Sequence, residues 1–237
     1  MRRARVCVIG VGGVGSWSVE ALARSGVGAL TLVDLDEVCI SNVNRQLPAI
    51  SSEIGKPKVR VLQARVAEIN PECEVHPLEE FFTAANANKI LGNRFDCVLD
   101  AIDAAPHKAL LLAGCARRKT PVVTVGSAGG RRDATALRMR DLAFTSHDRL
   151  LGRIRKILRA EHGFPEDPQT PFGIPCVYSV EAPVYPQPDG TVCGTRAPGS
   201  EPRLNCNSGY GSATFVTGAF GFAAAAEVVR VITGGAG

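Results

Sequence analysis

A glycine-rich turn stands near the start of the chain, directly after a short apolar run. Residues 5–9 (RVCVI) end at Gly10, and the sequence then reads Gly-Val-Gly-Gly-Val-Gly before a helix-like stretch. Glycines let the backbone approach a ligand closely, and the helix N-terminus that follows offers N–H groups and the positive end of its dipole. The sequence therefore predicts a phosphate-binding turn built on Gly10, Gly12, Gly13 and Gly15.

An acidic residue ends the next apolar run, at a spacing typical of nucleotide sites. The run 29–33 stops at Asp34, which lies 19 residues after Gly15. In dinucleotide-binding folds a carboxylate at this strand end accepts hydrogen bonds from ribose hydroxyls. These two features alone are equally compatible with a nicotinamide-dependent oxidoreductase.

The polar residues that follow favour a triphosphate instead. Asn42 and Arg45 lie in VDLDEVCISNVNRQ, and Lys58 lies in GKPKV at the start of a helical stretch. Several cations just beyond a strand end suit the larger charge of ATP. Asp103 follows a later apolar run at the same edge, where it would hold Mg²⁺ against phosphate oxygens. The set predicts adenylyl transfer, with Arg45, Lys58 and Asp103 as the catalytic candidates.

Three of these residues also have a purely structural interpretation. Asn42 would cap a turn, and Lys58 would be a solvated residue in the first turn of its helix. Asp103 would be the N-cap of a helix that covers residues 104–118, because Asp is a favoured residue at that position. The sequence leaves these alternatives open.

The elements around these residues alternate between strands and helices. We expect strands at 5–9, 29–33, 73–76, 95–99 and 122–125, and helices at 16–25, 56–69 and 106–118. Such alternation predicts a parallel sheet covered on both faces. The expected fold is α/β: a Rossmann-like doubly wound, mostly parallel sheet, with a C-terminal extension of extra strands and a helix.

The second half of the chain follows a different pattern. Segments 178–185 and 191–193 are expected to be strands that pack back on the sheet. Residues 213–226 form an uncharged run that predicts a buried helix. Its 14 residues fall short of the roughly 20 that a membrane span needs. We therefore expect no membrane association.

Positive charge is concentrated in one segment. The chain carries 27 basic and 23 acidic residues, a net charge of +4, but residues 131–159 hold nine basic and three acidic residues. Such a surface suits the phosphates of a nucleic acid, and a solvated helix face is the alternative. We interpret residues 1–237 as a single adenylating domain that contains a basic helical lobe with a mobile connector at 131–175.

The eight cysteines indicate neither zinc nor disulfides. No two of them form a C-x-x-C pair, so no structural zinc is expected. The start of the chain does not read as an export signal, which predicts a reducing, cytoplasmic location. A thiol role is conceivable for Cys176 and Cys206, and a buried structural role is the alternative.

The combined pattern resembles the ubiquitin-activating-enzyme-like adenylating superfamily, of ThiF, MoeB and HesA type. Its motifs GxGGxG, D, SN-x-x-RQ, G-x-PK and D are matched by residues 10–15, Asp34, 41–46, 55–58 and Asp103. The resemblance implies the same roles: the glycines and Asp34 for ATP, Asn42, Arg45 and Lys58 for phosphates, and Asp103 for the metal.

Within the superfamily, the sequence looks most like the dehydratases that act on threonylcarbamoyladenosine next to the tRNA anticodon. Further matching stretches are 13–28, AIDAAPHKALL, CVYSVEAPVYPQPDG and SGYGSATFVTGAFGF. The resemblance implies that ATP with Mg²⁺ activates a carboxylate, and that cyclisation then releases AMP with net loss of water. It also implies a homodimer and a cysteine-desulfurase sulfur-transfer system as a partner.

Two other functions stay open. One is the adenylation of a ubiquitin-like sulfur-carrier protein, against which the absence of paired C-x-x-C motifs counts. The other is a catalytically weak nucleotide-binding homologue. The superfamily has an arginine ahead of the first strand that reaches the neighbouring subunit's ATP site, whereas here the strand is expected to begin at Arg5. Arg2 and Arg3 are too close to that strand for the role, so the sequence leads us to expect either a truncated start or weakened activity.

Overall fold

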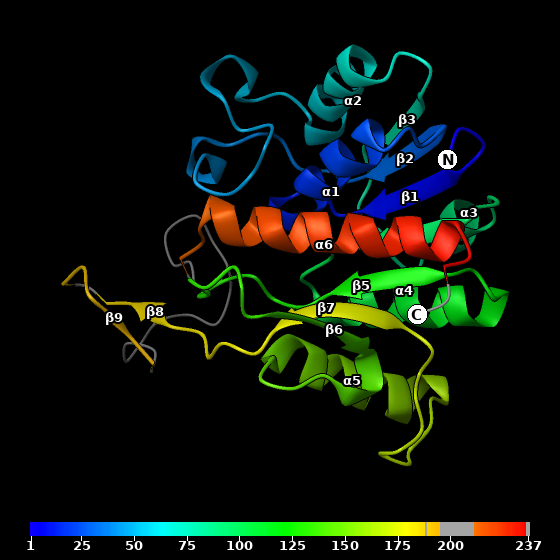
Figure 1. The fold of residues 1–237 in the computed structure, drawn as a ribbon, viewed down its shortest axis with the longest axis vertical. Helices are drawn as coiled ribbons and strands as arrows, with labels where there is room; N and C mark the ends of the chain where they lie inside the picture. The colour runs from blue at the N-terminus through cyan, green and yellow to red at the C-terminus, as the bar shows by residue number, and fades with distance from the viewer. Residues whose placement is uncertain (188, 195–210, 236–237) are drawn as a thin grey trace.

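A seven-stranded sheet forms the centre of the molecule (Figure 1). The computed structural model describes residues 1–187, 189–194 and 211–235. In the order in which they lie side by side, the strands are β3 (Glu74–Leu78), β2 (Ala29–Val33), β1 (Arg5–Ile9), β4 (Cys97–Asp100), β5 (Val122–Val125), β7 (Pro175–Ser179) and β6 (Leu137–Asp141). All neighbouring pairs are parallel except β6 with β7. The predicted doubly wound α/β fold is confirmed.

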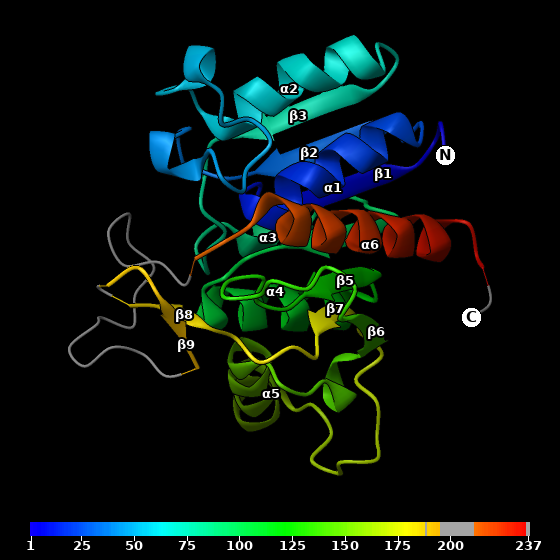
Figure 2. The same ribbon diagram turned by 60° about the vertical axis from the view of Figure 1, so that its left-hand side comes forward.

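Helices cover both faces of this sheet (Figures 1 and 2). One face carries α1 (Gly13–Arg24), α2 (Lys58–Ile69) and α6 (Thr214–Ile232), and the other carries α3 (Ala87–Leu91), α4 (Ala105–Arg118) and α5 (Arg149–His162). Because side chains alternate along a strand, each face receives its own core. In β1, Val6 and Val8 enter one core, and Cys7 and Ile9 enter the other.

The carboxyl ends of the parallel strands all lie at one edge of the sheet, on the left of Figure 1. From β1 the chain builds the sheet outward in one direction through β2 and β3, and from β4 in the other direction through β5. The helices that follow β1 and β4, α1 and α4, lie on opposite faces of the sheet. Ligands of doubly wound folds bind in the crevice that opens at such a switch point. Short 3₁₀ helices, η1 (Ile40–Asn42), η2 (Ser51–Glu53) and η3 (Leu142–Phe144), lie in the connections.

The strands expected at 178–185 and 191–193 do not both pack back on the sheet. The segment 178–185 does not form one strand: β7 ends at Ser179, and β8 (Tyr185–Pro186) pairs with β9 (Val192–Cys193) in a separate two-stranded ribbon. Pro183 lies in the break between β7 and β8, where it cannot donate a ladder hydrogen bond. The antiparallel edge strand β6 was not anticipated.

The predicted buried helix is the N-terminal part of α6. Within the described residues, α6 is the one helix that is long and apolar enough to cross a membrane by length and composition. It packs against α1, β4, β5 and β7. Gly221 permits the close crossing with α1, since a Cβ there would lie 2.6 Å from Trp17 Cβ. These contacts are those of a core helix.

Candidate nucleotide-binding site

The glycine-rich turn joins β1 to α1. Two of its glycines have no room for a Cβ, whereas the other two leave space in front of the helix. Gly10 has a φ of +84°, and a Cβ there would lie 2.8 Å from the carbonyl oxygen of Ala101. A Cβ on Gly15 would lie only 1.9 Å from the carbonyl oxygen of Gly10. Gly12, the N-cap of α1, and Gly13, its first residue, meet only side-chain atoms, at 3.3 Å or more. The first pair is required by packing, and the second pair leaves the helix N-terminus open to a ligand.

Asp34 holds the glycine-rich turn from the end of β2. Its Oδ2 accepts a hydrogen bond from Val11 N at 2.8 Å, and its Oδ1 accepts one from Asp36 N at 2.9 Å. Burial raises the pKa of Asp34, although the two backbone hydrogen bonds and the nearby Lys58 oppose the rise. Each carboxylate oxygen keeps acceptor capacity beyond these bonds, so the ribose role predicted for Asp34 stays a prediction.

Lys58 is buried and paired, not solvated. It is the first residue of α2, and its side chain is only 5% exposed. Its Nζ lies 2.8 Å from Asp36 Oδ2, and its backbone N–H donates to the Asp36 carbonyl. The alternative interpretation of Lys58 as an exposed first-turn residue is therefore wrong. Asp36 was missed from the sequence, although its position two residues after Asp34 is a usable signal.

Arg45 lies beside the glycine-rich turn. Its backbone carbonyl accepts hydrogen bonds from Trp17 Nε1 at 3.2 Å and from Thr217 Oγ1 at 3.0 Å, which ties the loop to both α1 and α6. Its Nη1 donates to the Ser41 carbonyl at 2.7 Å. Its Cγ is 3.9 Å from where a Cβ on Gly13 would stand. The structure thus places the aliphatic stem of Arg45 beside the open N-terminus of α1, while its guanidinium is held by Ser41 and by Asn44 Oδ1 within the same loop.

Asn42 is buried in the same loop and caps a turn. Its Oδ1 accepts a hydrogen bond from Cys39 N at 3.1 Å, which agrees with the structural alternative. The phosphate contact predicted for Asn42 stays a prediction, and the amide nitrogen is the group left for it. The following Gln46 was missed. Its Nε2 lies 3.7 Å from where a Cβ on Gly12 would stand, and its Oε1 accepts no hydrogen bond from any described residue.

Asp103 is exposed just beyond the end of β4. The N-cap of α4 is Ala104, and no side chain in the described part of the chain caps that helix, so the helix-cap alternative for Asp103 is wrong. Nowhere among the described residues do three His, Cys, Asp or Glu side chains gather as a metal site. A single carboxylate nevertheless fits Mg²⁺, because this ion commonly takes one or two protein carboxylates together with phosphate oxygens and water.

A buried ion pair below Asp103 was not predicted. Lys108 Nζ lies 2.9 Å from Asp100 Oδ2, and both side chains are 0% exposed. The ammonium also donates to the Ile102 carbonyl at 3.1 Å, and Thr124 Oγ1 donates to Asp100 Oδ2 at 2.6 Å. The pair therefore fixes the turn that carries Asp103.

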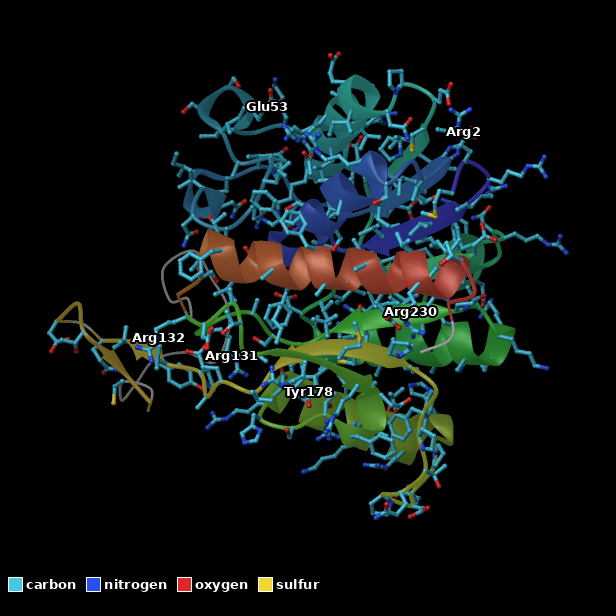
Figure 3. The ribbon with its side chains drawn as sticks, in the orientation of Figure 1. Arg2, Glu53, Arg131, Arg132, Tyr178 and Arg230 are labelled. Atoms are coloured by element: carbon cyan, nitrogen blue, oxygen red, sulfur yellow. The ribbon has the colours of Figure 1, made fainter. Side chains whose placement is uncertain are left out.

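Arg131, labelled in Figure 3, is a second cation that was not singled out from the sequence. It follows β5 at the same edge of the sheet and is only 3% exposed. Its Nη2 donates to the His147 carbonyl at 2.9 Å, whereas its Nε and Nη1 bond to no described residue. Burial lowers the pKa of Arg131, and the nearby Asp148 and Glu181 partly offset this effect.

The thiol of Cys176 is completely buried in β7. Burial is the largest cause of the strong rise in its pKa. A thiol nucleophile needs a populated thiolate, so these observations favour the structural alternative for Cys176. Cys206 lies outside the described residues.

Comparisons with known proteins agree with this geometry. The model of the ThiF family matches residues 1–236. The tRNA threonylcarbamoyladenosine dehydratase of Escherichia coli K12 is 45% identical over 228 residues, which cover 96% of this chain and 85% of the relative. The tRNA threonylcarbamoyladenosine dehydratase of Haemophilus influenzae is 46% identical over 230 residues, which cover 97% of this chain and 85% of that relative.

A solved structure extends the similarity to the fold. The crystal structure of the E. coli dehydratase in complex with ATP superposes with a TM-score of 0.86 and 39% identity, over 98% of this chain and 87% of that one. The E. coli sulfur carrier protein ThiS adenylyltransferase is 35% identical, but over only 53% of this chain. The match to the carrier-activating relative thus covers much less of this chain than the matches to the dehydratases. The chain belongs to the ThiF family and, within it, to the tRNA threonylcarbamoyladenosine dehydratases.

Proposed function

We propose that this chain is an ATP-dependent, AMP-forming enzyme that converts threonylcarbamoyladenosine, next to the tRNA anticodon, to its cyclic form. The substrate carboxylate attacks the α-phosphorus of ATP, and pyrophosphate leaves. A nitrogen of the same nucleoside then attacks the acyl-AMP, and AMP departs, with net loss of water from the nucleoside. Because both reacting groups belong to one nucleoside, proximity favours the second step.

The observation that carries this proposal is the position of Arg45 beside Gly13 at the open N-terminus of α1. A helix N-terminus binds phosphate, and an adjacent guanidinium neutralises charge that develops during phosphoryl transfer. A nicotinamide enzyme has no such charge to neutralise. Lys58, buried at the start of α2 and paired with Asp36, would supply a second cation.

We assign the remaining roles by position. Gly10, Gly12, Gly13 and Gly15 would bind the phosphates through the backbone, Asp34 would hold the ribose, and Asn42 would donate to a phosphate oxygen through its amide nitrogen. Asp103 would bind Mg²⁺, which supplies Lewis-acid stabilisation of the phosphate charge when it is bound.

We further propose that the enzyme works in the cytoplasm as a homodimer, that residues 1–237 form one adenylating domain with the basic lobe at 131–175, and that a cysteine-desulfurase system is a partner. The tRNA substrate suits the positive charge of that lobe. Light scattering of the purified chain tests the dimer: a mass of one chain at micromolar concentration contradicts it.

The deciding experiment supplies the chain with ATP, Mg²⁺ and tRNA that carries threonylcarbamoyladenosine. Nucleoside mass spectrometry should detect the cyclic product, with AMP formed in equal amount. Arg45→Ala and Asp103→Ala should each abolish turnover and leave the melting temperature unchanged. Normal turnover in either variant removes that residue from the site.

The carrier-protein alternative predicts a different result. If pyrophosphate exchange required a small protein ending in Gly-Gly and no tRNA product formed, the dehydratase proposal would be wrong. ATP binding without turnover of tRNA would favour the catalytically weak homologue.

A further inference from the structure

A continuous strip of cations runs along the exposed side of α5. Five of its members, Arg149, Arg153, Arg155, Lys156 and Arg159, line one hollow of about 420 Å³ together with Gly152. Arg149, Arg153 and Lys156 follow one another at spacings of four and three residues, which place side chains on one side of a helix. Arg155 and Arg159, four residues apart, lie along the neighbouring side and border the same hollow. The opposite side of α5 is apolar and packs into the core through Leu151, Ile154 and Leu158.

The strip has no acidic partner. In the described part of the chain no carboxylate oxygen lies within 4.0 Å of any of its five charged groups. Glu161, the one acidic residue within α5, lies two residues beyond Arg159 and so faces another side of the helix. Burial and then the neighbouring Arg159 lower the pKa of Arg155, and Cys176 and Asp148 partly offset this effect. An anion bound along the strip would relieve the repulsion that remains.

Two of the cations are held in place by hydrogen bonds to neutral groups, so their positive charge is not neutralised. Arg155 Nη1 donates to Thr145 Oγ1, and Arg159 Nε donates to the Pro165 carbonyl at 2.9 Å. The guanidinium of Arg159 also lies 5.1 Å from the centre of the Phe172 ring. Fixed cations lose less conformational entropy when they bind an anion. Arg149, Arg153 and Lys156 are exposed and reach outward.

Gly152 keeps the floor of the hollow open. Glycine destabilises a helix interior relative to alanine, yet a Cβ at this position would meet nothing closer than Arg155 Nη2, at 3.8 Å. Packing within the chain therefore does not require glycine here. An open floor between cations suits a group that carries its own oxygens into the hollow, such as a phosphodiester.

The strip leads away from the candidate nucleotide-binding site. Asp148, the N-cap of α5, accepts a hydrogen bond from Ser127 N at 2.7 Å, just past the end of β5. A Cβ on Gly126 would lie 2.5 Å from Asp148 Oδ2, so the first turn of α5 abuts the ligand edge of the sheet. From there the helix extends 14 residues, about 21 Å. Figure 2 shows α5 across the sheet from α6.

We propose that this strip on α5 binds the phosphodiester backbone of the RNA substrate, next to the nucleotide that reacts at the sheet edge. The inference rests on the proposed function for its ligand, and it assigns the surface that the RNA occupies. The strip would not distinguish between nucleotide sequences, because contacts to phosphates position a nucleic acid without identifying its bases.

The test measures tRNA affinity by fluorescence anisotropy across a series of salt concentrations, with the unmodified transcript as the probe. The double variant Arg153→Gln/Lys156→Gln should lower the slope of log K against log [salt] by about 1.4 to 1.8, since each lost phosphate contact removes about 0.7 to 0.9. Its KM for modified tRNA should rise about tenfold, with kcat and the KM for ATP unchanged. The matched control is Arg117→Gln/Lys119→Gln, which removes equal charge from exposed positions at the end of α4.

A second variant keeps all five cations and changes only the floor of the hollow. Gly152→Glu places a carboxylate in the floor of the hollow and improves helix propensity, so the fold should melt no earlier while tRNA affinity falls. An unchanged salt slope in the double variant, or an equal change in the control, overturns the proposal. Loss of binding to anionic vesicles with tRNA affinity intact would assign the strip to lipid instead. If the wild type binds tRNA through the strip but forms no cyclic product, the proposed function fails and the docking surface stands.

Discussion

Lys108 Nζ and Asp100 Oδ2 lie 2.9 Å apart, with both side chains fully buried beneath the turn that carries Asp103. A buried ion pair contributes little net stability, but removing one partner leaves an unpaired charge in the core. The same ammonium donates to the Ile102 carbonyl, so the pair also sets the backbone that leads to the proposed metal ligand.

Lys108→Met should therefore destabilise the chain by about 3 to 5 kcal/mol. The companion change Asp100→Asn should recover a large part of this loss, because the charge disappears while Thr124 Oγ1 can still donate to the amide oxygen. Urea unfolding of the two single variants and the double variant measures the coupling. Simple additivity of the two single losses would contradict the interpretation.

Asp34→Asn separates the stability role of this carboxylate from its ligand role. Burial raises the pKa of Asp34 in the folded state, so its contribution to stability is present below the unfolded pKa and is lost as pH rises through the folded pKa. The stability of the wild type relative to the Asn variant should therefore fall as pH rises through the acid range and then level off. Calorimetry from pH 3 to about pH 7 checks the direction.

The same variant should bind ATP more weakly, because an amide offers one acceptor oxygen for the two backbone N–H groups of Val11 and Asp36. Isothermal titration with ATP measures the loss. Wild-type affinity in Asp34→Asn would show that the turn does not depend on this carboxylate.

Glu20 joins α1 to α2 and has the opposite dependence on pH. Its Oε2 lies 2.6 Å from Arg65 Nε, and its Oε1 lies 2.8 Å from Arg24 Nε. Burial alone would raise the pKa of Glu20, but the hydrogen bonds from both arginines outweigh burial, and the net effect is a lowered pKa. Its contribution to stability is present above the unfolded pKa and lost as pH falls through the folded pKa.

Glu20→Gln should cost about 2 kcal/mol near neutral pH, as expected for hydrogen bonds between charged groups. The cost should shrink on acidification. Urea unfolding at several pH values measures it, with the exposed Glu68→Gln on α2 as the control. A loss in Glu20→Gln that stays constant with pH would argue against the ion pair.

The buried cysteines should be inert in the native chain. Burial raises the pKa of Cys97 and of Cys115 to about 12, and it raises those of Cys7 and Cys176 further. Iodoacetamide near neutral pH should label these four thiols only after unfolding, which peptide mass spectrometry can follow. Cys176→Ala should retain turnover, whereas a loss of turnover at normal stability would restore the catalytic interpretation.

Sequence patterns located the elements whose signals are local. The runs 5–9, 29–33 and 122–125 coincide with β1, β2 and β5. Each is a short, mostly apolar run, and the first two end at a glycine and at an acidic residue, which mark the end of the strand in the sequence itself. Strand β6 (LRMRD) was missed because it lies at the edge of the sheet and three of its five residues are exposed, so no alternation marks it.

The residues of the candidate site likewise divide into those that a motif marks and those whose role depends on tertiary packing. Gly10, Asp34, Arg45 and Lys58 stand in spaced motifs that can be found by inspection. Lys108 is not marked in this way, because a lysine in an Ala- and Leu-rich helix looks like a surface residue until the packing of α4 on β4 is known. The burial of Arg131 likewise depends on segments distant in the chain, since the backbone of Gly130 is bonded to Gly211 and Val184.

The hydrogen bond from Thr217 to the Arg45 carbonyl spans 172 positions of the chain. On a ribosome that adds 5 to 20 residues per second, the glycine-rich turn and its arginine emerge on the order of 10 to 30 s before the helix that braces them. During that interval the nascent chain has no complete ATP site, and the apolar side of α1 that α6 later covers is exposed. The order of synthesis thus makes α6 the step that completes the site, and it makes the unfinished chain a substrate for chaperones.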